Sequence, residues 1–245
     1  MTFDKHGICD LKPGKESKFW HKDYPKRRPF NKSAYLKEWD RYLSEPVKVV
    51  LDVGALDGGD TLRFNSWYPD AKIYSIEGSP HNFRVIGQKL EERKNVTVYN
   101  YVISDKDEEV EFHQVSYDAK RDSYYDARTM VMGSIYKMTR AHTKPHQLRP
   151  IDSVMVQSFT IDTFCEMHNI TDVDIMHVDI EGAGVPMLKG MNTIRPKMIY
   201  IEKEQDHIFE DKPAGGTDAL REILVNMGYT LEINLRNDYL FVRGI

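Results

Sequence analysis

The sequence is poor in cysteine and has no long apolar run. Cys9 and Cys165 are its only cysteines in 245 residues, and neither belongs to a C-x-x-C pair. This excludes a disulfide framework and a paired-cysteine zinc or redox motif, and it favours a reducing compartment. No apolar stretch is long enough to span a bilayer, and the N-terminus lacks the apolar core of a secretory signal. We therefore expect a soluble, cytoplasmic protein without a membrane span.

An excess of positive charge is also absent. The formal net charge is -4, which argues against a protein that binds nucleic acid over its whole surface but leaves room for a local basic patch. The hydrophobic fraction of 40% is sufficient for one large core in a chain of this length. A single α/β domain is the expected architecture.

Strand patterns alternate with helix patterns along the chain. Apolar or alternating runs predict strands over residues 48–54, 71–77, 96–104, 109–115, 154–159, 174–182 and 198–204. Helical patterns lie between them over 59–67, 80–93, 160–168, 185–191 and 217–227. This alternation predicts a doubly wound, mostly parallel sheet with helices on both faces. Residues 229–235 and 238–244 predict a closing antiparallel hairpin, because only two residues separate them.

Two regions interrupt the alternation. Residues 1–45 form a basic, proline-punctuated arm with a possible helix over 33–43, and the main domain is expected over 46–245. Residues 117–152 are a long insertion with seven lysines and arginines, and we expect a lid or binding loop there.

The stretch VVLDVGALDGGDTLRF, residues 49–64, passes from a buried strand through three glycines into a helical pattern. A glycine-rich turn at this place lets a ligand approach the backbone near a helix N-terminus. The spacing is not the G-x-G-x-x-G of a dinucleotide site, so a pyrophosphate is a poorer fit. Glu77 ends the next strand, where an acidic side chain can accept hydrogen bonds from ribose hydroxyls. The pattern favours a nucleoside ligand.

Three stretches together resemble one family. VLDVGALDGGDTLRF, IYSIEGSP and FTIDTFCEMHNITDVDIMHVDIEGAGVPMLKGM are similar to the FkbM family of S-adenosylmethionine-dependent methyltransferases, in order and spacing from Val49 to Glu202. The run D-x-E-G-x-x-x-x-x-L-K-G, residues 179–190, is the most specific piece. The resemblance implies a seven-stranded Rossmann-like sheet, S-adenosylmethionine as methyl donor and transfer to a hydroxyl oxygen.

The resemblance also implies where the cofactor binds. Asp52 and the turn from Gly54 to Gly58 would hold its methionine end, Glu77 its ribose, and the segment 101–105 its adenine. The full set of candidate cofactor-binding residues is Asp52, Gly54, Ala55, Asp57, Gly58, Thr61, Glu77, Gly78, Ser79, Val102, Ser104 and Asp179. One position departs from the family pattern: Gly184 stands where an acidic residue usually follows the D-x-E-G motif. This puts in doubt any catalytic or metal role that the family assigns there.

Methyl transfer to a hydroxyl needs alignment of the reactants and a group that removes a proton. His177, Asp179 and Glu181 are spaced by two and would share one face if the strand stayed extended. Asp179 is the strongest candidate, because an acid in an apolar strand is costly to bury without a partner. His207 follows the neighbouring strand and could act as a base near neutral pH.

A metal ion is possible at this edge but is not expected. Asp179, Glu181 and Glu204 offer oxygen ligands of the kind that Mg²⁺ or Ca²⁺ prefers. Nothing in their spacing demands a metal, and no His or Cys cluster indicates zinc.

The insertion supplies candidates for acceptor binding: Ser134, Tyr136 and Arg140, together with Glu204. Arginine and aromatic side chains suit sugars, phosphates and nucleotides, and a positively charged lid predicts an anionic acceptor. We expect a small-molecule or glycan acceptor.

Other functions stay open at this point. A nucleic-acid 2′-O-methyltransferase could use the basic arm and insertion, although the acidic net charge opposes it. A non-catalytic cofactor-binding scaffold would keep the glycine turn and Glu77 without an acceptor site. An NAD-dependent oxidoreductase is disfavoured by the glycine spacing. Oligomeric state is left undetermined.

Overall fold

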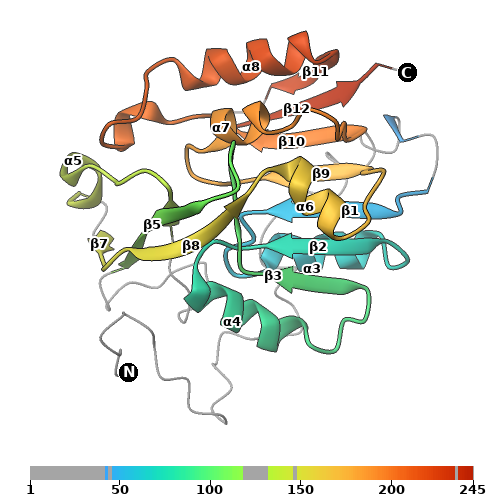
Figure 1. Cartoon of the computed structure of the whole chain (residues 1–245), viewed down its shortest axis with the longest axis horizontal. Coiled ribbons are helices and arrows are strands. Elements are labelled where there is room, and N and C mark those ends of the chain that lie inside the picture. Colours follow the sequence, from blue (N-terminus) through green and yellow to red (C-terminus); the bar gives the residue numbers. More distant parts are fainter. Residues whose placement is uncertain (1–41, 44–45, 118–131, 146–147, 235–236, 245) are drawn as a thin grey trace.

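A seven-stranded sheet runs through the molecule, with helices on both faces and a smaller sheet beside it (Figure 1). This computed structural model describes residues 42–43, 46–117, 132–145, 148–234 and 237–244. The predicted N-terminal arm and its helix over 33–43 lie almost entirely outside the described residues, as does the middle of the predicted insertion.

The order of strands in the main sheet matches the predicted doubly wound fold. From one edge to the other the strands are β11 (Tyr229–Asn234), β12 (Asp238–Arg243), β10 (Met198–Glu202), β9 (Ile175–Val178), β1 (Val49–Val53), β2 (Lys72–Ile76) and β3 (Val96–Tyr99). Neighbours from β10 to β3 pair in parallel, whereas β12 is antiparallel to both β10 and β11. The Rossmann-like sheet and its closing antiparallel pair are thereby confirmed. The carboxyl ends of β1, β2, β9 and β10 meet at one edge.

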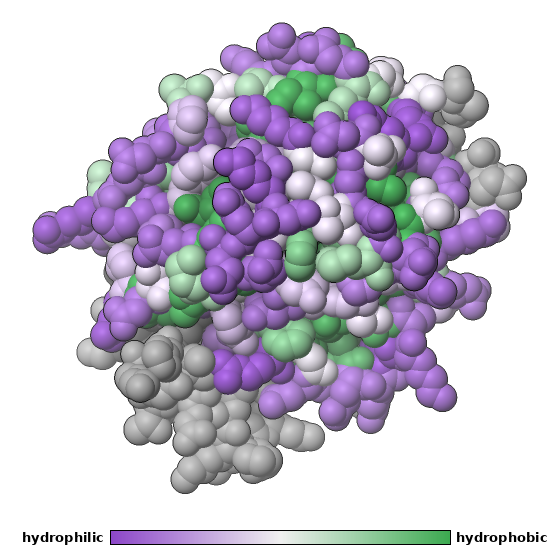
Figure 2. All heavy atoms as spheres, viewed as in Figure 1, coloured by the Kyte–Doolittle hydropathy of each residue, from purple (hydrophilic) through white to green (hydrophobic). Residues whose placement is uncertain are grey.

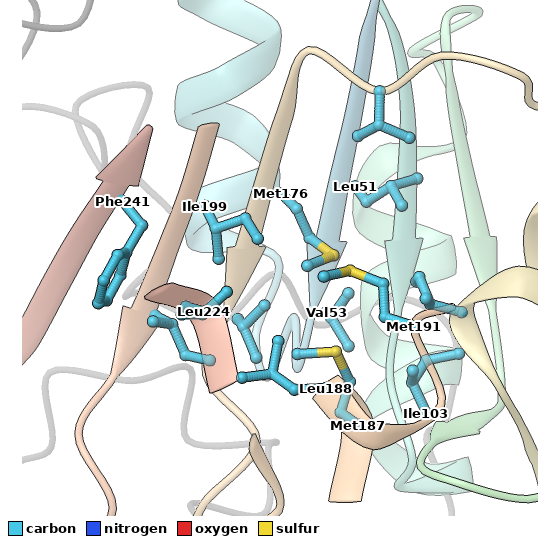
Figure 3. Close-up of a cluster of buried hydrophobic side chains, with 14 of the residues drawn as sticks. Leu51, Val53, Ile103, Met176, Met187, Leu188, Met191, Ile199, Leu224 and Phe241 are labelled. Atoms are coloured by element: carbon cyan, nitrogen blue, oxygen red, sulfur yellow. The ribbon is translucent and has the colours of Figure 1, made fainter. Parts of the chain in front are cut away.

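The larger part of the core lies between the sheet and three helices. These helices are α6 (Ile161–Met167), α7 (Gly184–Lys189) and α8 (Gly216–Asn226). Figure 3 shows Met187 and Leu188 of α7 and Leu224 of α8 beside Leu51, Met176 and Ile199 of the central strands, and all six side chains are buried. Buried apolar side chains of this size contribute about 1.5–3 kcal/mol each to folding. This layer therefore anchors the strand ends that carry the site.

The opposite face is covered by α3 (Gly59–Trp67) and α4 (Pro80–Leu90). Phe64 of α3 packs with Val50, Ile73 and Ile175, which alternate along their strands with the residues of the first layer. The helix α4 begins at Pro80, with Ser79 as N-cap accepting a hydrogen bond from the Asn82 amide. The predicted helix over 80–93 thus ends earlier, at Leu90.

The second sheet corrects the placement of two predicted strands. β5 (Glu109–Tyr117) and β8 (Val154–Phe159) exist but pair antiparallel with each other outside the main sheet. Short strands extend this second sheet: β4 (Val102–Ile103), β6 (Met132–Ser134) and β7 (Leu148–Pro150). From Glu109 to His113 in β5, polar and apolar residues alternate, which is typical of a strand with one solvated face. The remaining short elements are α5 (Arg140–Thr143) and the 3₁₀ helix η1 (Asp206–Ile208).

The predicted continuous strand over 96–104 is wrong, because it is broken at Asn100. The side chain of Asn100 donates hydrogen bonds to the carbonyl oxygens of Glu77 and Gly78, at 2.8 and 3.0 Å. These bonds tie the chain to the segment after β2, and the next residues leave the main sheet to pair with β8. The break brings Tyr101, Val102 and Ile103 to the site edge of the sheet.

The predicted strand over 174–182 is also too long. β9 ends at Val178, and Glu181 and Gly182 both have positive φ angles, 48° and 86°. An extended chain would need negative φ at these positions. The expected shared face of His177, Asp179 and Glu181 is therefore wrong, because a turn replaces the strand after Val178.

Hydrophilic residues predominate on the molecular face shown in Figure 2, and apolar residues form small separate patches there. Within the described ranges, none of the helices has the length and hydropathy needed to cross a bilayer.

Candidate active site

The turn between β1 and α3 brings its backbone against the end of β9. Gly54 and Gly58 have φ angles of 89° and 72°, which favour glycine. The Gly54 and Ala55 amides donate to the carbonyl oxygen of Ile76 at 2.9 and 3.1 Å. A Cβ atom on Gly54 would lie 1.8 Å from the carbonyl oxygen of Asp179. Glycine is therefore required at position 54 by both conformation and space.

A cavity opens above the carboxyl ends of β1, β2 and β9. It encloses about 1050 Å³ of empty space, including its open mouth. One wall consists of the turn from Gly54 to Asp57, Glu77 with Gly78, and the segment from Tyr101 to Ile103. The turn from Asp179 to Ala183 and residues of the second sheet complete the lining. Open α/β sheets bind ligands at this edge, so the cavity is the candidate active site.

Glu77 is the buried acidic group of the first wall. Its two carboxylate oxygens accept hydrogen bonds from the Leu56 and Ser79 amides, both at 2.7 Å. Burial raises the pKa of Glu77 to about 7, although these backbone bonds and the side chain of Asn82 partly oppose the shift. The carboxylate is thus held rigidly at the cavity wall, with its remaining lone pairs available to a hydroxyl donor.

Asp52 lies below the cavity and does not line it. One of its carboxylate oxygens is 2.8 Å from His177 Nδ1, and the other accepts a 2.5 Å hydrogen bond from the Thr61 hydroxyl. Burial alone would lower the pKa of His177, but the hydrogen bond to Asp52 and the nearby charges of Asp60 and Asp52 raise it to about 9. His177 is therefore a buried imidazolium that also stacks on Tyr200, with ring centroids 5.5 Å apart. We do not assign the catalytic base to it.

This pair predicts a pH-dependent stability. The folded-state pKa of His177 is raised above its ordinary 6.5, so its contribution is present below pH 6.5 and lost as pH rises through about 9. We expect the free energy of unfolding to fall by up to about 3 kcal/mol over this window. Urea denaturation at pH 6.5 and 9.5 would measure the decrease. In His177→Gln the decrease should largely disappear, and an equal decrease in both proteins would contradict the assignment.

Three carboxylates meet at the ends of β9 and β10, and two of them, Asp179 and Glu181, line the cavity. Carboxylate oxygens of Asp179, Glu181 and Glu202 lie within 4.8 Å of one another. Burial and the neighbouring Asp179 hold the pKa of Glu181 well above its ordinary range, and burial with the same neighbour raises the pKa of Glu202 to about 11. Asp179 is exposed at the cavity, yet desolvation by the surrounding protein raises its pKa, while the imidazolium of His177 and a hydrogen bond from protonated Glu202 partly oppose this shift. Asp179 is thus the member of the cluster most suited to be ionised.

Glu204 does not join this cluster, contrary to its predicted grouping with Asp179 and Glu181. Its side chain is buried and lies 2.7 Å from the Lys212 ammonium. The other carboxylate oxygen accepts a hydrogen bond from the Val185 amide at 3.1 Å and would be 2.7 Å from a Cβ atom on Gly184. Glu204 therefore occupies the space beside Gly184, where a larger residue would collide with it.

The described part of the insertion packs over the D-x-E-G turn. The Ser134 hydroxyl donates a hydrogen bond to the carbonyl oxygen of Glu181 at 2.7 Å, and the Thr139 amide donates one to the carbonyl oxygen of Ile208 at 2.8 Å. Tyr136 lies against Phe209, with ring centroids 6.1 Å apart. Met132, Gly133 and Ile135 line the cavity. This segment thus forms a wall of the site.

The predicted site residues fall into three groups. Those that line the cavity are Gly54, Ala55, Asp57, Glu77, Gly78, Val102, Asp179 and Glu181. Others lie outside the lining and are buried or half-buried: Asp52, Gly58, Thr61, Ser79, Ser104, Ser134, Tyr136, His177 and Glu204. His207 and Arg140 are exposed and do not line the cavity, which gives no support to a catalytic His207 or an acceptor-binding Arg140.

Sequence reasoning missed Asp60, Asn82 and Phe112, which line the cavity, and it did not select Glu202 of the carboxylate cluster, although Glu202 lies at the same strand end as Glu204. Glu202 carried a usable signal, because it ends an apolar strand in the same way as Glu77. Asn82 stands three residues after the N-cap Ser79, which places it in the first turn of α4. Phe112 carried no signal, because its contact with the site depends on how the second sheet packs.

Comparison with known proteins decides the family. The model of the methyltransferase FkbM domain matches residues 52–231, well over half of the chain. The chain belongs to the FkbM methyltransferase family. It is therefore an S-adenosylmethionine-dependent methyltransferase, as the resemblance of the sequence motifs predicted.

Individual proteins similar to this FkbM-family chain are distant. The 2-O-methyltransferase NoeI of Sinorhizobium fredii (strain NBRC 101917 / NGR234) is 22% identical over 201 residues, which cover 81% of this chain and 78% of NoeI. A putative caffeoyl-CoA O-methyltransferase from Staphylococcus aureus has a TM-score of 0.46 at 10% identity, covering 86% of this chain and 82% of that one. The precorrin-6y C5,15-methyltransferase from Geobacter metallireducens GS-15 has a TM-score of 0.43 at 11% identity, with 88% and 89% covered.

Proposed function

We propose that this FkbM-family protein methylates a hydroxyl oxygen of a small molecule or glycan, with S-adenosylmethionine bound along the first cavity wall and Asp179 as the base. The observation that supports it most is the arrangement of the cavity. Its lining combines the glycine backbone and Glu77 with two members of the carboxylate cluster, Asp179 and Glu181.

The residues of the first wall fit the cofactor. The turn from Gly54 to Asp57 lines the cavity, and the N-terminus of α3 suits the carboxylate of a methionine moiety. Glu77 is oriented by two backbone amides for the ribose hydroxyls. The acidic lining also complements a sulfonium cation. When bound, S-adenosylmethionine supplies an electrophilic methyl group and leaves as a neutral thioether.

The protein's part in the reaction is alignment and proton removal. The acceptor hydroxyl gives its proton to the Asp179 carboxylate while its oxygen forms the new bond to the methyl carbon, and the electrons of the broken carbon–sulfur bond stay on sulfur. Glu202 holds Asp179 through their hydrogen bond, and the imidazolium of His177 favours the ionised form of Asp179. General base catalysis of this kind typically contributes 10²–10⁴-fold in rate. No metal ion is needed for this sequence of steps.

Calorimetry with S-adenosylmethionine tests the cofactor site. Because Glu77 has a pKa near 7 and must be ionised to accept ribose hydrogen bonds, we expect affinity to rise with pH up to about 7 and then level off. The dissociation constant at pH 6 should be several-fold to tenfold larger than at pH 8. Glu77→Gln should weaken binding by about 1–3 kcal/mol and remove the pH dependence.

S-adenosylhomocysteine and NAD are the matched comparisons in this experiment. The demethylated product should bind and NAD should not. Binding of NAD alone would overturn the methyltransferase site. Unchanged affinity in a folded Glu77→Gln protein would overturn only the ribose assignment.

A further inference from the structure

The cavity has a second wall that the cofactor motifs do not form. Phe112 of β5, Met132 and Gly133 of β6, and Ile135 after it line this side. The ring of Phe112 is buried between two glycines, because a Cβ atom on Gly78 or Gly133 would lie 2.7 or 2.5 Å from it. The wall is therefore apolar and firmly packed.

The titratable carboxyl groups of the cavity have no basic counterpart in its described lining. Among the described residues that line it are five carboxylates and no lysine, arginine or histidine: Asp57, Asp60, Glu77, Asp179 and Glu181. Asp57 and Asp60 lie near the ammonium of Lys89 and the guanidinium of Arg63, respectively. In the described part of the chain Asp179 and Glu181 form no such ion pair, and they stand beside the apolar wall.

The described basic residues of the insertion add no positive charge to the cavity lining. Lys137 is exposed and pairs with Glu210 at 2.8 Å. Arg140, Lys144 and Arg149 are exposed and lie outside the cavity lining. Lys120, Arg121 and Arg128 fall outside the described residues. The geometry gives no support to the anionic acceptor that the composition of the insertion predicted.

We propose that the acceptor is uncharged around the hydroxyl that is methylated and presents an apolar face to the wall of Phe112, Met132 and Ile135. This inference rests on the proposed function, because the proposed function assigns the cavity wall that contains Glu77 to the cofactor. A phosphate or carboxylate near the reacting hydroxyl would face the Asp179 carboxylate in a partly desolvated cavity, where like charges repel strongly. Neutral sugars and other uncharged alcohols avoid this repulsion.

A pair of fragments of similar shape tests the charge preference without knowledge of the acceptor. Cyclohexylmethanol and cyclohexanecarboxylate are titrated into the full chain saturated with S-adenosylhomocysteine. Binding is followed by the ¹³C-methyl NMR signal of Met132, which is assigned from the spectrum of Met132→Leu. We expect the alcohol to bind with a dissociation constant at least tenfold lower than that of the carboxylate.

The outcomes separate this inference from the proposed function. If S-adenosylhomocysteine does not bind, the proposed function fails. If it binds but the carboxylate matches or exceeds the alcohol, or neither fragment moves the Met132 signal, the inference about the acceptor is overturned.

A substitution in the wall provides a second readout. Ile135→Arg places a cation beside the acceptor and should reverse the preference toward cyclohexanecarboxylate. Ile135→Met keeps the wall apolar and should preserve the preference for the alcohol. Retained affinity for S-adenosylhomocysteine shows that each variant is folded. An alcohol preference that persists in folded Ile135→Arg would contradict the placement of the acceptor at this wall.

Discussion

Asp179→Asn should lower kcat by about 10²–10⁴-fold at saturating S-adenosylmethionine. The amide has nearly the size of the carboxylate but cannot accept the proton of the acceptor hydroxyl. Thermal stability should stay the same or rise, because desolvation raises the pKa of Asp179 and the ionised carboxylate is therefore unfavourable in the folded protein. The measurements are the formation of S-adenosylhomocysteine with an acceptor that the wild-type protein methylates, and the melting temperature.

The control for this prediction is Asp172→Asn, which makes the same chemical change at an exposed position outside the cavity. Its rate should equal that of the wild type. An Asp179→Asn protein with wild-type kcat would show that Asp179 is not the catalytic base. Activity that is lost after chelation and restored by Mg²⁺ would instead show that the carboxylate cluster holds a metal ion.

Gly54→Ala should abolish S-adenosylmethionine binding and destabilise the fold. The new methyl carbon would stand 1.8 Å from the Asp179 carbonyl oxygen, and since the backbone fixes both positions, neither atom can rotate away. The φ angle of 89° adds strain for any residue with a Cβ atom. We expect a loss of several kcal/mol in the free energy of unfolding, measured by urea denaturation, and no heat of binding in calorimetry.

Gly87→Ala is the matched comparison, because it introduces the same methyl group within α4, where no atom beyond the local helix backbone lies within 4 Å of the new carbon. Alanine is the better helix former, so this variant should be stabilised by about 0.5–1 kcal/mol. Wild-type stability and binding in Gly54→Ala would show that the turn can shift and that its close approach to β9 is not required.

The central strands were predictable because their sequences are continuous apolar runs. β1, β2, β9 and β10 appear at their predicted places, and the parallel order follows from their alternation with helices. The pairing of β5 with β8 was not predictable in the same way. Local patterns indicate that a segment is extended, but they do not specify which sheet receives it. The break at Asn100 depended on side-chain hydrogen bonds to a distant strand end.

Site residues were predictable where the backbone conformation requires glycine or where an acidic residue follows an apolar strand. Gly54, Glu77 and Asp179 all lie at the cavity. Side-chain partners were harder to predict, because they come from other strands. Asp52 and His177 occupy opposed positions in the pairing of β1 and β9, and this register, absent from the sequence, joins them below the site. The position of the Glu204 side chain likewise depends on its ion pair with Lys212, which follows the 3₁₀ helix η1 in the sequence.

The position of Phe112 between Gly78 and Gly133 has a consequence for how acceptor specificity can diversify. One aromatic ring fits into two sockets that lack side chains, one in the cofactor half of the site and one in the insertion. A chimera that exchanges residues 113–152 with those of another family member could alter the acceptor without disturbing the donor site, provided that a glycine still faces the ring from the grafted segment. A graft with a larger residue at that point should push the ring toward Gly78 and so disturb the cofactor half of the site. Family members can therefore exchange this segment independently of the donor site only if the glycine is kept.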